Sequence, residues 1–287
     1  MMKRLLIASV VTLVLAAPAA AQEERFQIAS GARVSIRSPE GDIRVRAVSG
    51  REGRARLDSG EDEDLVTVRR SGNSITIEPM YGDGGDMLVS LPGDVSLEVV
   101  GLDGDISIVG FSNEITIETF DGDVDVDGAG VLSIRTVDGD VQVRNVARSA
   151  AVDFGDGDVH LTGVRGPVAV NGVDGDITVQ DADSRQVAIA TISGNLWYDG
   201  RVYDGGEYQL GTHDGDVTFA VPQGVGATVS VLSYDGALIP SFPLQMRGSV
   251  GSIAEFTLGD GSAHVQLESF DGNIHLIRPG ERSPDRQ

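Results

Sequence analysis

Apolar and polar residues alternate in short stretches along this chain, and the stretches come in pairs that flank a glycine. We align ten copies with the residue before that glycine as position 0. Positions −6, −4, +3 and +5 are then apolar in every copy, and the residues between −6 and −4 are mostly polar, as at Ser35, Thr116 and Gln266. An alternation with period two is typical of a strand with one buried face. Each copy is therefore predicted to form two short strands joined by a tight turn.

The turn reads Asp-Gly-Asp followed by an aliphatic residue in most copies, and the copies from Asp103 to Asp174 recur every 17 or 18 residues. A short fixed period indicates stacked copies of one small unit. The glycine predicts a positive φ, or a place where neighbouring units come too close for a Cβ. The aspartate at position 0 suits an Asx turn, which bonds to the backbone two residues ahead. The ten copies have position 0 at Glu40, Asp103, Asp121, Asp138, Asp156, Asp174, Ser193, Asp214, Asp235 and Asp271.

Two all-β architectures fit this pattern. One is a parallel β-solenoid (β-helix) with one coil of about 18 residues per copy, and the other is a run of antiparallel hairpins, because Asp-Gly between alternating apolar residues is also a hairpin signal. The uniform columns favour the solenoid, in which each residue stacks on its counterpart in the next coil. We expect a single domain over residues 22–278, with an irregular N-terminal part at 22–96 and the repeat array at 97–278. Residues 279–287 are expected to form a disordered tail.

The first 21 residues predict a secretory signal peptide. Lys3 and Arg4 precede the apolar run Leu5–Ala17, and Ala19–Ala21 supplies the small residues of a cleavage site. The apolar run is too short for a membrane span, which needs about 20 residues, and no later stretch is long enough either. We therefore expect a periplasmic or secreted protein with no integral membrane segment after cleavage.

The charge is strongly negative and unevenly distributed. The full chain carries −22, and removal of residues 1–21 lowers this value to −24. Residues 22–75 hold ten arginines and ten acids, so the whole excess lies in the repeats. Nucleic acid needs a basic surface and is excluded as a partner. There is no cysteine, which excludes disulfides and thiol chemistry.

The order of segments resembles the bacterial putative-adhesin domain of unknown function, a β-solenoid family of secreted or envelope proteins. The residues that carry the resemblance are Met87–Pro92, then Leu97–Val99, then Gly104–Ile108 and the further Gly-Asp-aliphatic repeats. The similarity covers roughly residues 28–277. It implies a solenoid fold and a role in adhesion or at the envelope, and it implies no catalytic residues.

Calcium is the sharpest candidate ligand of the repeat. In a solenoid, the aspartates at positions 0 and +2 would form columns spaced by about 4.8 Å, and bound cations would relieve the repulsion between them. Calcium-binding β-rolls, however, carry acidic residues and extra glycines at both ends of each coil, which this repeat lacks. Solvated turns without metal are the alternative, so the metal-binding residues stay unknown.

The other candidate chemistry is sparse. Trp197 and Tyr203 could stack on a sugar ring or pack within their loop, whereas Tyr198 and Tyr208 fall in inward columns and predict core positions. The histidines lack metal-ligand spacing and are predicted to be outward strand or turn residues; they are His160, His213, His264 and His275. No nucleophile elbow, phosphate loop or zinc motif occurs.

The sequence therefore predicts a protein that is not an enzyme and has no cofactor. It favours an adhesin-like, scaffold or envelope-interaction protein that binds a protein or glycan partner in the envelope or outside the cell. Two alternatives are a calcium-binding structural repeat and, less favoured, a polysaccharide-acting β-helix enzyme.

Overall fold

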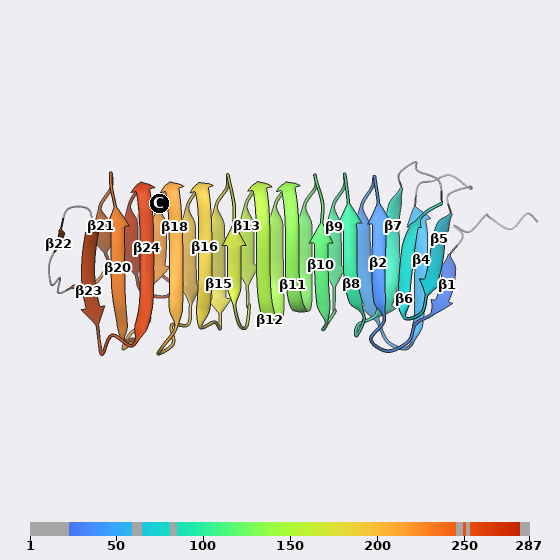
Figure 1. Cartoon of the computed structure of the whole chain (residues 1–287), viewed down its shortest axis with the longest axis horizontal. Coiled ribbons are helices and arrows are strands. Elements are labelled where there is room, and N and C mark those ends of the chain that lie inside the picture. Colours follow the sequence, from blue (N-terminus) through green and yellow to red (C-terminus); the bar gives the residue numbers. More distant parts are fainter. Residues whose placement is uncertain (1–22, 59–64, 81–84, 245–248, 251–252, 282–287) are drawn as a thin grey trace, which may run out of the picture.

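The chain forms one elongated stack of β-coils (Figure 1). The computed structural model describes residues 23–58, 65–80, 85–244, 249–250 and 253–281. Within these residues there is no helix, and strands of successive coils pair in parallel. The predicted parallel β-solenoid is thus confirmed, and the hairpin alternative is wrong for the array. The signal sequence expected at Met1–Ala21 lies outside the described residues.

Each coil contributes one strand to each of two faces. The first face, which leads into the turn, contains β2 (Arg33–Ser38), β6 (Ser74–Pro79), β8 (Ser96–Gly101), β10 (Glu114–Glu118), β14 (Val168–Asn171), β16 (Gln186–Ser193), β18 (Glu207–Asp214), β20 (Ala227–Ser233) and β24 (Ala263–Asp271). The second face contains β3 (Ile43–Val48), β7 (Asp86–Pro92), β9 (Ile106–Val109), β13 (Val159–Thr162), β15 (Ile177–Ala182), β17 (Leu196–Gly200), β19 (Val217–Ala220), β21 (Leu238–Pro240) and β25 (Ile274–Ile277). The long strands β11 (Val124–Asp138) and β12 (Val141–Asp156) belong to both faces.

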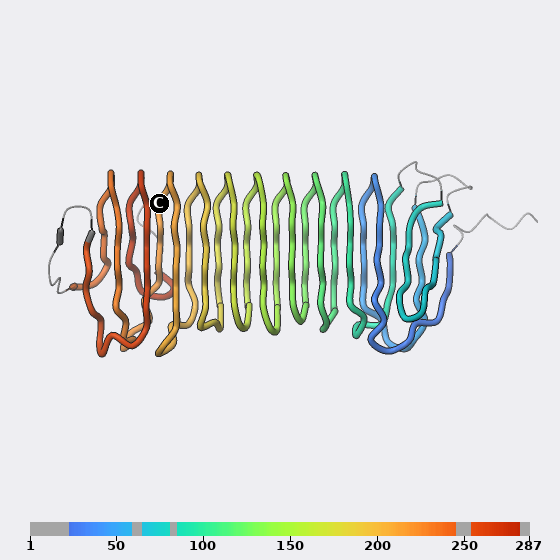
Figure 2. Tube along the Cα trace, viewed as in Figure 1, coloured from blue at the N-terminus to red at the C-terminus, as the bar shows by residue number. Residues whose placement is uncertain are grey.

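The turns make one regular edge of the stack and the closing loops make the other (Figure 2). We call these the turn edge and the loop edge. The aliphatic columns fill the space between the two faces. For example, Val141 pairs with Val124 on one side and with Val159 on the other, and all three are buried. Stacking of β-branched residues in register is therefore the source of the core, as the columns predicted.

At both ends the spatial order of the coils departs from the chain order. Strand β2 lies between β6 and β8, and β24 lies between β18 and β20. The expectation that every coil stacks on its sequence neighbour is wrong there. Pro240 offers a physical reason at the C-terminal end, because a residue without an N–H cannot be paired on both sides. Its strand β21 pairs with β25 alone among the described strands.

Antiparallel strands cap the stack. At the N-terminal end, β4 (Glu52–Asp58) pairs with β7 and β1 (Glu24–Gln27), and β5 (Val66–Ser71) pairs with β6. At the other end, β23 (Ile253–Leu258) pairs with β20 and with β22 (Ser249–Val250). These caps end the parallel pairing and cover the terminal coils. Without them, the end coils of the repeat array would expose their core to water.

The turn glycines meet both conditions that the sequence suggested. Gly122 has φ +113°, and a Cβ built on it would lie 2.4 Å from the carbonyl oxygen of Gly104 in the preceding coil. Gly139 has the same relation to Gly122, again at 2.4 Å. A side chain at this position would therefore push neighbouring coils apart.

Replacement of one turn glycine tests this constraint. We expect Gly122→Ala to lower the free energy of unfolding by about 1–2 kcal/mol through backbone strain and by a further 1–3 kcal/mol or so through overpacking. Gly50→Ala is the matched control, because Gly50 also has positive φ (+100°) but a Cβ there meets no atom within 4 Å. Urea denaturation of both variants measures the difference. Equal losses would show that close approach of the coils does not matter.

Candidate functional site

The residue at position +2 of the turn, which is acidic in most coils, takes part in a hydrogen-bond ladder that runs along the turn edge. The backbone N–H of Asp140 donates to Oδ1 of Asp123 at 2.8 Å, and the N–H of Asp158 donates to Oδ1 of Asp140 at 2.8 Å. The same bond recurs from coil to coil with distances of 2.6–3.3 Å. In stacking order, the acceptors are Asp86, Asp42, Asp105, Asp123, Asp140, Asp158, Asp176, Asn195, Asp216 and Asn273.

This ladder corrects the predicted Asx turn. The turn carboxylates that bond to backbone in the described residues are those at +2, and they bond to the next coil rather than to their own turn. Two ladder positions hold asparagine, and the side-chain oxygens of Asn195 and Asn273 accept the same N–H bond. The fold therefore needs an acceptor oxygen at +2 and does not need the negative charge.

The carboxylates at position 0 have no such structural task. Asp121, Asp138 and Asp174 are exposed, and among the described residues their side chains make no hydrogen bond or ion pair. They lie beside the ladder, at most one in each coil. Most turns therefore contain two acids, one at position 0 and one at +2. The turn edge thus carries a dense negative charge, part of which is not required by the fold.

A groove of about 410 Å³ follows the ladder on the second face. Its acidic lining consists of Asp42, Asp105, Asp123, Asp125, Asp140 and Asp158. Arg44 lies in the groove and forms ion pairs with Asp42 at 2.6 Å and Asp86 at 2.8 Å, and the hydrogen bond that its guanidinium donates to Asp86 raises the pKa of Arg44. A groove with this lining suits a cation better than an anion.

An exposed apolar row runs along the other side of the turns, at position −1. We call it the apolar ridge; in stacking order it contains Leu102, Phe120, Val137, Val173, Ile192, Phe270 and Tyr234. Each of these residues is 47–61% exposed. Gly155 and His213 occupy the same column, and the His213 ring stacks on Phe270 with centroids 4.7 Å apart. A row of exposed apolar side chains along one edge of the molecule marks an interaction surface.

The ridge was missed from the sequence, although a signal for it exists. Position −1 is an outward position, where a polar residue is expected, and it is apolar in most copies. Single exposed valines are common on protein surfaces and need no explanation. Only the alignment of position −1 across coils, read as a column, would have revealed the ridge.

Two members of the aromatic cluster lie in the core, as predicted, and Trp197 is half-buried. Tyr198 and Tyr208 are fully buried and pack with Phe219, and burial raises the pKa of Tyr198 far above its ordinary value. Tyr203 is half-buried; Arg185 lies over its ring at 4.7 Å, and its hydroxyl bonds to Asp183. Since Arg185 of the preceding coil covers one face of this ring, the geometry does not support the use of Tyr203 as a sugar-stacking platform.

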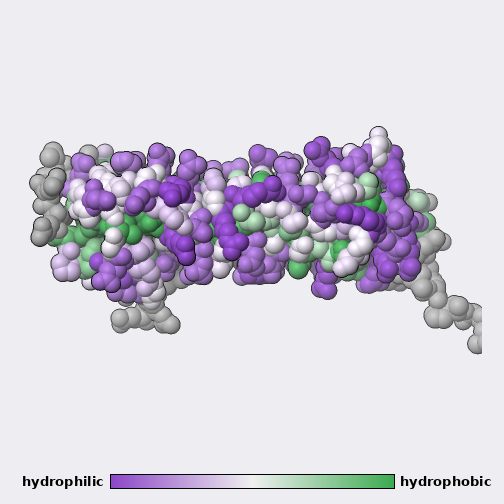
Figure 3. All heavy atoms as spheres, turned by 90° about the horizontal axis from the view of Figure 1, so that it is seen from below, coloured by the Kyte–Doolittle hydropathy of each residue, from purple (hydrophilic) through white to green (hydrophobic). Residues whose placement is uncertain are grey.

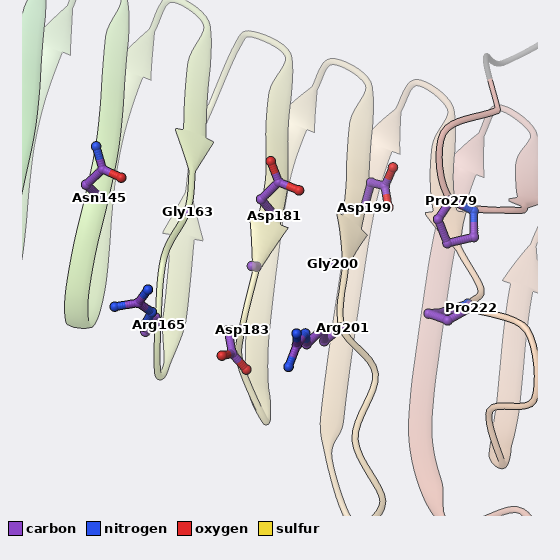
Figure 4. Close-up of a pocket in the computed structure, with 11 residues that line it drawn as sticks. Asn145, Gly163, Arg165, Asp181, Asp183, Asp199, Gly200, Arg201, Pro222 and Pro279 are labelled. Carbon is purple, nitrogen blue, oxygen red and sulfur yellow. The ribbon is translucent and has the colours of Figure 1, made fainter.

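A hollow of about 480 Å³ lies beside this loop, toward the loop edge (Figure 4). Arg165, Asp183 and Arg201 come from successive coils and alternate in charge along it. Asn145 (φ 60°) and Asp181 (φ 52°) line its other side, where neighbouring coils use glycine at the same left-handed corner. Viewed from the loop edge, the surface is mostly hydrophilic with short apolar patches (Figure 3). The hollow is lined by charges of both signs, so it is a lesser candidate.

The described residues contain no cluster of side chains suited to a metal ion. No group of three or more histidine, aspartate and glutamate side chains in this part of the chain is arranged to hold a metal ion. Three histidines are exposed, whereas His275, which lies between the inward Ile274 and Leu276 of β25, is buried and lies 3.4 Å from Asp216. Among the described residues, no helix is long and apolar enough to cross a membrane.

The ladder predicts a difference between two substitutions at one position. Asp123→Ala removes the acceptor for the N–H of Asp140 and should lower the free energy of unfolding by about 1–2 kcal/mol. Asp123→Asn keeps an acceptor oxygen, as Asn195 does in its own coil, and should stay within about 0.5 kcal/mol of wild type. Urea denaturation, together with hydrogen exchange at the Asp140 amide, measures both. Equal destabilisation by the two variants would mean that charge, and not hydrogen bonding, stabilises the turn.

Calcium is tested by thermal unfolding. Because the ladder oxygens already accept backbone N–H groups, we expect the same melting temperature in millimolar calcium and in excess chelator. A ligand that binds only the folded state raises the melting temperature with its concentration. A reproducible rise in calcium, absent in magnesium at equal ionic strength, would contradict this expectation.

Comparison with known proteins found similar solved structures and a matching family model. A structure described as a "putative cell adhesion protein" from Clostridium sporogenes ATCC 15579 is 12% identical, with 90% of this chain and 100% of that chain covered and a TM-score of 0.25. A "putative adhesin" from Bacteroides fragilis NCTC 9343 is 11% identical, with 90% and 97% covered and a TM-score of 0.40. At these values neither structure says what this chain binds, and no curated protein matches it. The family model described as Toastrack DUF4097 matches residues 66–277, well over half of the chain, and the protein therefore belongs to the Toastrack family.

Proposed function

We propose that this protein is a non-catalytic, adhesin-like binding protein of the cell envelope or cell exterior, and that the turn edge is its contact surface. The observation that carries the proposal is the apolar ridge, whose seven side chains are each 47–61% exposed in one column of the stack. Apolar surface in contact with water is costly, and a partner that covers it recovers this free energy. A straight stack of coils holds the side chains in one line without any further ordering.

The extracytoplasmic location is supported by the sequence pattern. Lys3 and Arg4, the apolar run Leu5–Ala17 and the small residues Ala19–Ala21 are typical of a secretory signal. An acidic chain without cysteine is compatible with either the periplasm or the exterior.

The absence of catalysis is supported by the distribution of titratable groups. Active sites gather groups with perturbed pKa values in one cleft. Here, the turn acids recur coil after coil along the stack, and Asp94, whose pKa falls to about 2, owes this to an ion pair with Arg51 in the N-terminal part of the stack. The calcium-binding and polysaccharide-cleaving alternatives have no comparable support.

Co-sedimentation with isolated cell envelopes tests the proposal. We expect labelled mature protein to bind saturably, and we expect the triple ridge variant Phe120→Ser, Val137→Ser and Val173→Ser to bind at least about tenfold more weakly, since each removed side chain loses buried apolar area. The matched control is Val48→Ser, Val109→Ser and Ile239→Ser, which removes exposed apolar residues outside the ridge.

Circular dichroism and thermal unfolding first establish that both triple variants are folded. If the ridge variant then binds envelopes as well as wild type and the control variant do, the turn edge is not the contact surface and the proposal fails.

A further inference from the structure

We propose that the apolar ridge binds a cationic amphipathic helix, whose apolar stripe lies on the ridge while its lysines and arginines pair with the carboxylates at position 0. This inference rests on the proposed function, because it names the partner of the same surface. It follows from three properties of the turn edge: its length, its paired backbone and its charge.

The ridge is long and straight. It extends over nine coils from Leu102 to Tyr234. At about 4.8 Å per coil this is a row of roughly 38 Å, which equals the length of a helix of about 25 residues. A folded globular partner would touch such a narrow row at a few coils only, whereas a helix can follow it along its length.

The backbone at the turn edge is already paired. The N–H of Asp121 donates to the carbonyl of Leu102 at 3.1 Å, and the N–H of Asp138 donates to the carbonyl of Phe120 at 3.0 Å. The N–H groups at +2 are used by the ladder. An added strand would find no free row of donors here, so strand addition is disfavoured. A helix satisfies its own backbone and needs only side-chain contacts.

The charge beside the ridge selects a cationic partner. The position-0 carboxylates of Asp103, Asp121, Asp138, Asp156 and Asp174 form an exposed row, and among the described residues they have no ion-pair partner. They follow the ridge residues directly in sequence, so one row flanks the other along the turn edge. Apolar side chains with flanking cations are the complement of this surface.

Two other occupants are disfavoured by the same charge. A second copy of this chain would place one acidic row against another, and the chain carries −22 overall. An anionic lipid surface would be repelled in the same way. Both remain measurable outcomes: dimerisation of the wild type through the ridge, or ridge-dependent binding to phosphatidylglycerol vesicles, would overturn the inference.

Fluorescence anisotropy with designed peptides tests the inference on the full mature protein. The probe is a labelled 25-residue Leu/Lys peptide with one apolar stripe. We expect it to bind at least about tenfold more tightly than a scrambled peptide of the same composition, and to lose affinity as salt rises from about 50 to about 500 mM. A Leu/Glu peptide with the same stripe should not bind. Equal binding of the striped and scrambled Leu/Lys peptides would overturn the inference.

Charge variants separate specific pairing from general attraction. Asp121→Asn, Asp138→Asn and Asp174→Asn together remove three carboxylates beside the ridge, and we expect a loss of affinity of about tenfold or more for the Leu/Lys peptide. The control Glu98→Gln, Glu114→Gln and Glu207→Gln changes the net charge equally on the first face, away from the turns. It should bind the peptide like wild type. An equal loss in both triple variants would mean that overall charge attracts the peptide, and the inference would be wrong.

The two proposals fail in different ways. If envelope binding depends on the ridge but the Leu/Lys peptide does not bind, the partner is not a cationic helix and the proposed function stands. If envelope binding does not depend on the ridge, the proposed function itself fails. The triple serine variant of the ridge should lose the peptide as well, since the apolar contacts are shared by both experiments.

Discussion

Close contact between turn glycines sets the geometry of the whole molecule. At Gly122 and Gly139 the backbone of one coil touches the carbonyl of the previous coil where a Cβ would otherwise stand. Successive coils can therefore approach to strand-pairing distance at the sharpest bend of the chain. The +2 acceptors add a second restraint, because each fixes the N–H of the next turn. These two contacts hold every column in register, and both the buried aliphatic columns and the exposed rows follow from that register.

The regular part of the fold could be predicted because the repeat shows which positions share the interior, and the uniform columns favoured stacked coils over hairpins. Apolar residues at −6, −4, +3 and +5 must share an interior, and the glycine must occupy a place where no side chain fits. The ends could not be predicted in this way. Whether β18 pairs with β20, the next first-face strand in the sequence, or with β24 depends on which coil can stand at the end of the stack, and that choice involves Pro240 and the antiparallel cap β23, both outside the repeat pattern.

Only part of the candidate site could be predicted from the sequence, for a related reason. The acidic residues were obvious, but the sequence assigned the turn hydrogen bond to position 0, whereas Asp123 and its counterparts at +2 make it. A local turn motif considers one turn at a time, and here the donor belongs to the next coil. The apolar ridge was hidden for the same reason. Val137 or Ile192 alone is an ordinary exposed residue, and only the register places them in one row.

The asparagines in the ladder show that the fold does not require all of the negative charge on the turn edge. Asn195 and Asn273 show that a neutral amide makes the coil-to-coil bond, so a stack built from asparagine at +2 would fold with far less repulsion between turns. Most coils nevertheless carry a carboxylate at +2 and a second one at position 0. Repulsion between neighbouring carboxylates is a cost to the folded state that the hydrogen bonds alone do not require. A surface that combines this charge with an exposed apolar row is best understood as one that a cationic, apolar partner completes.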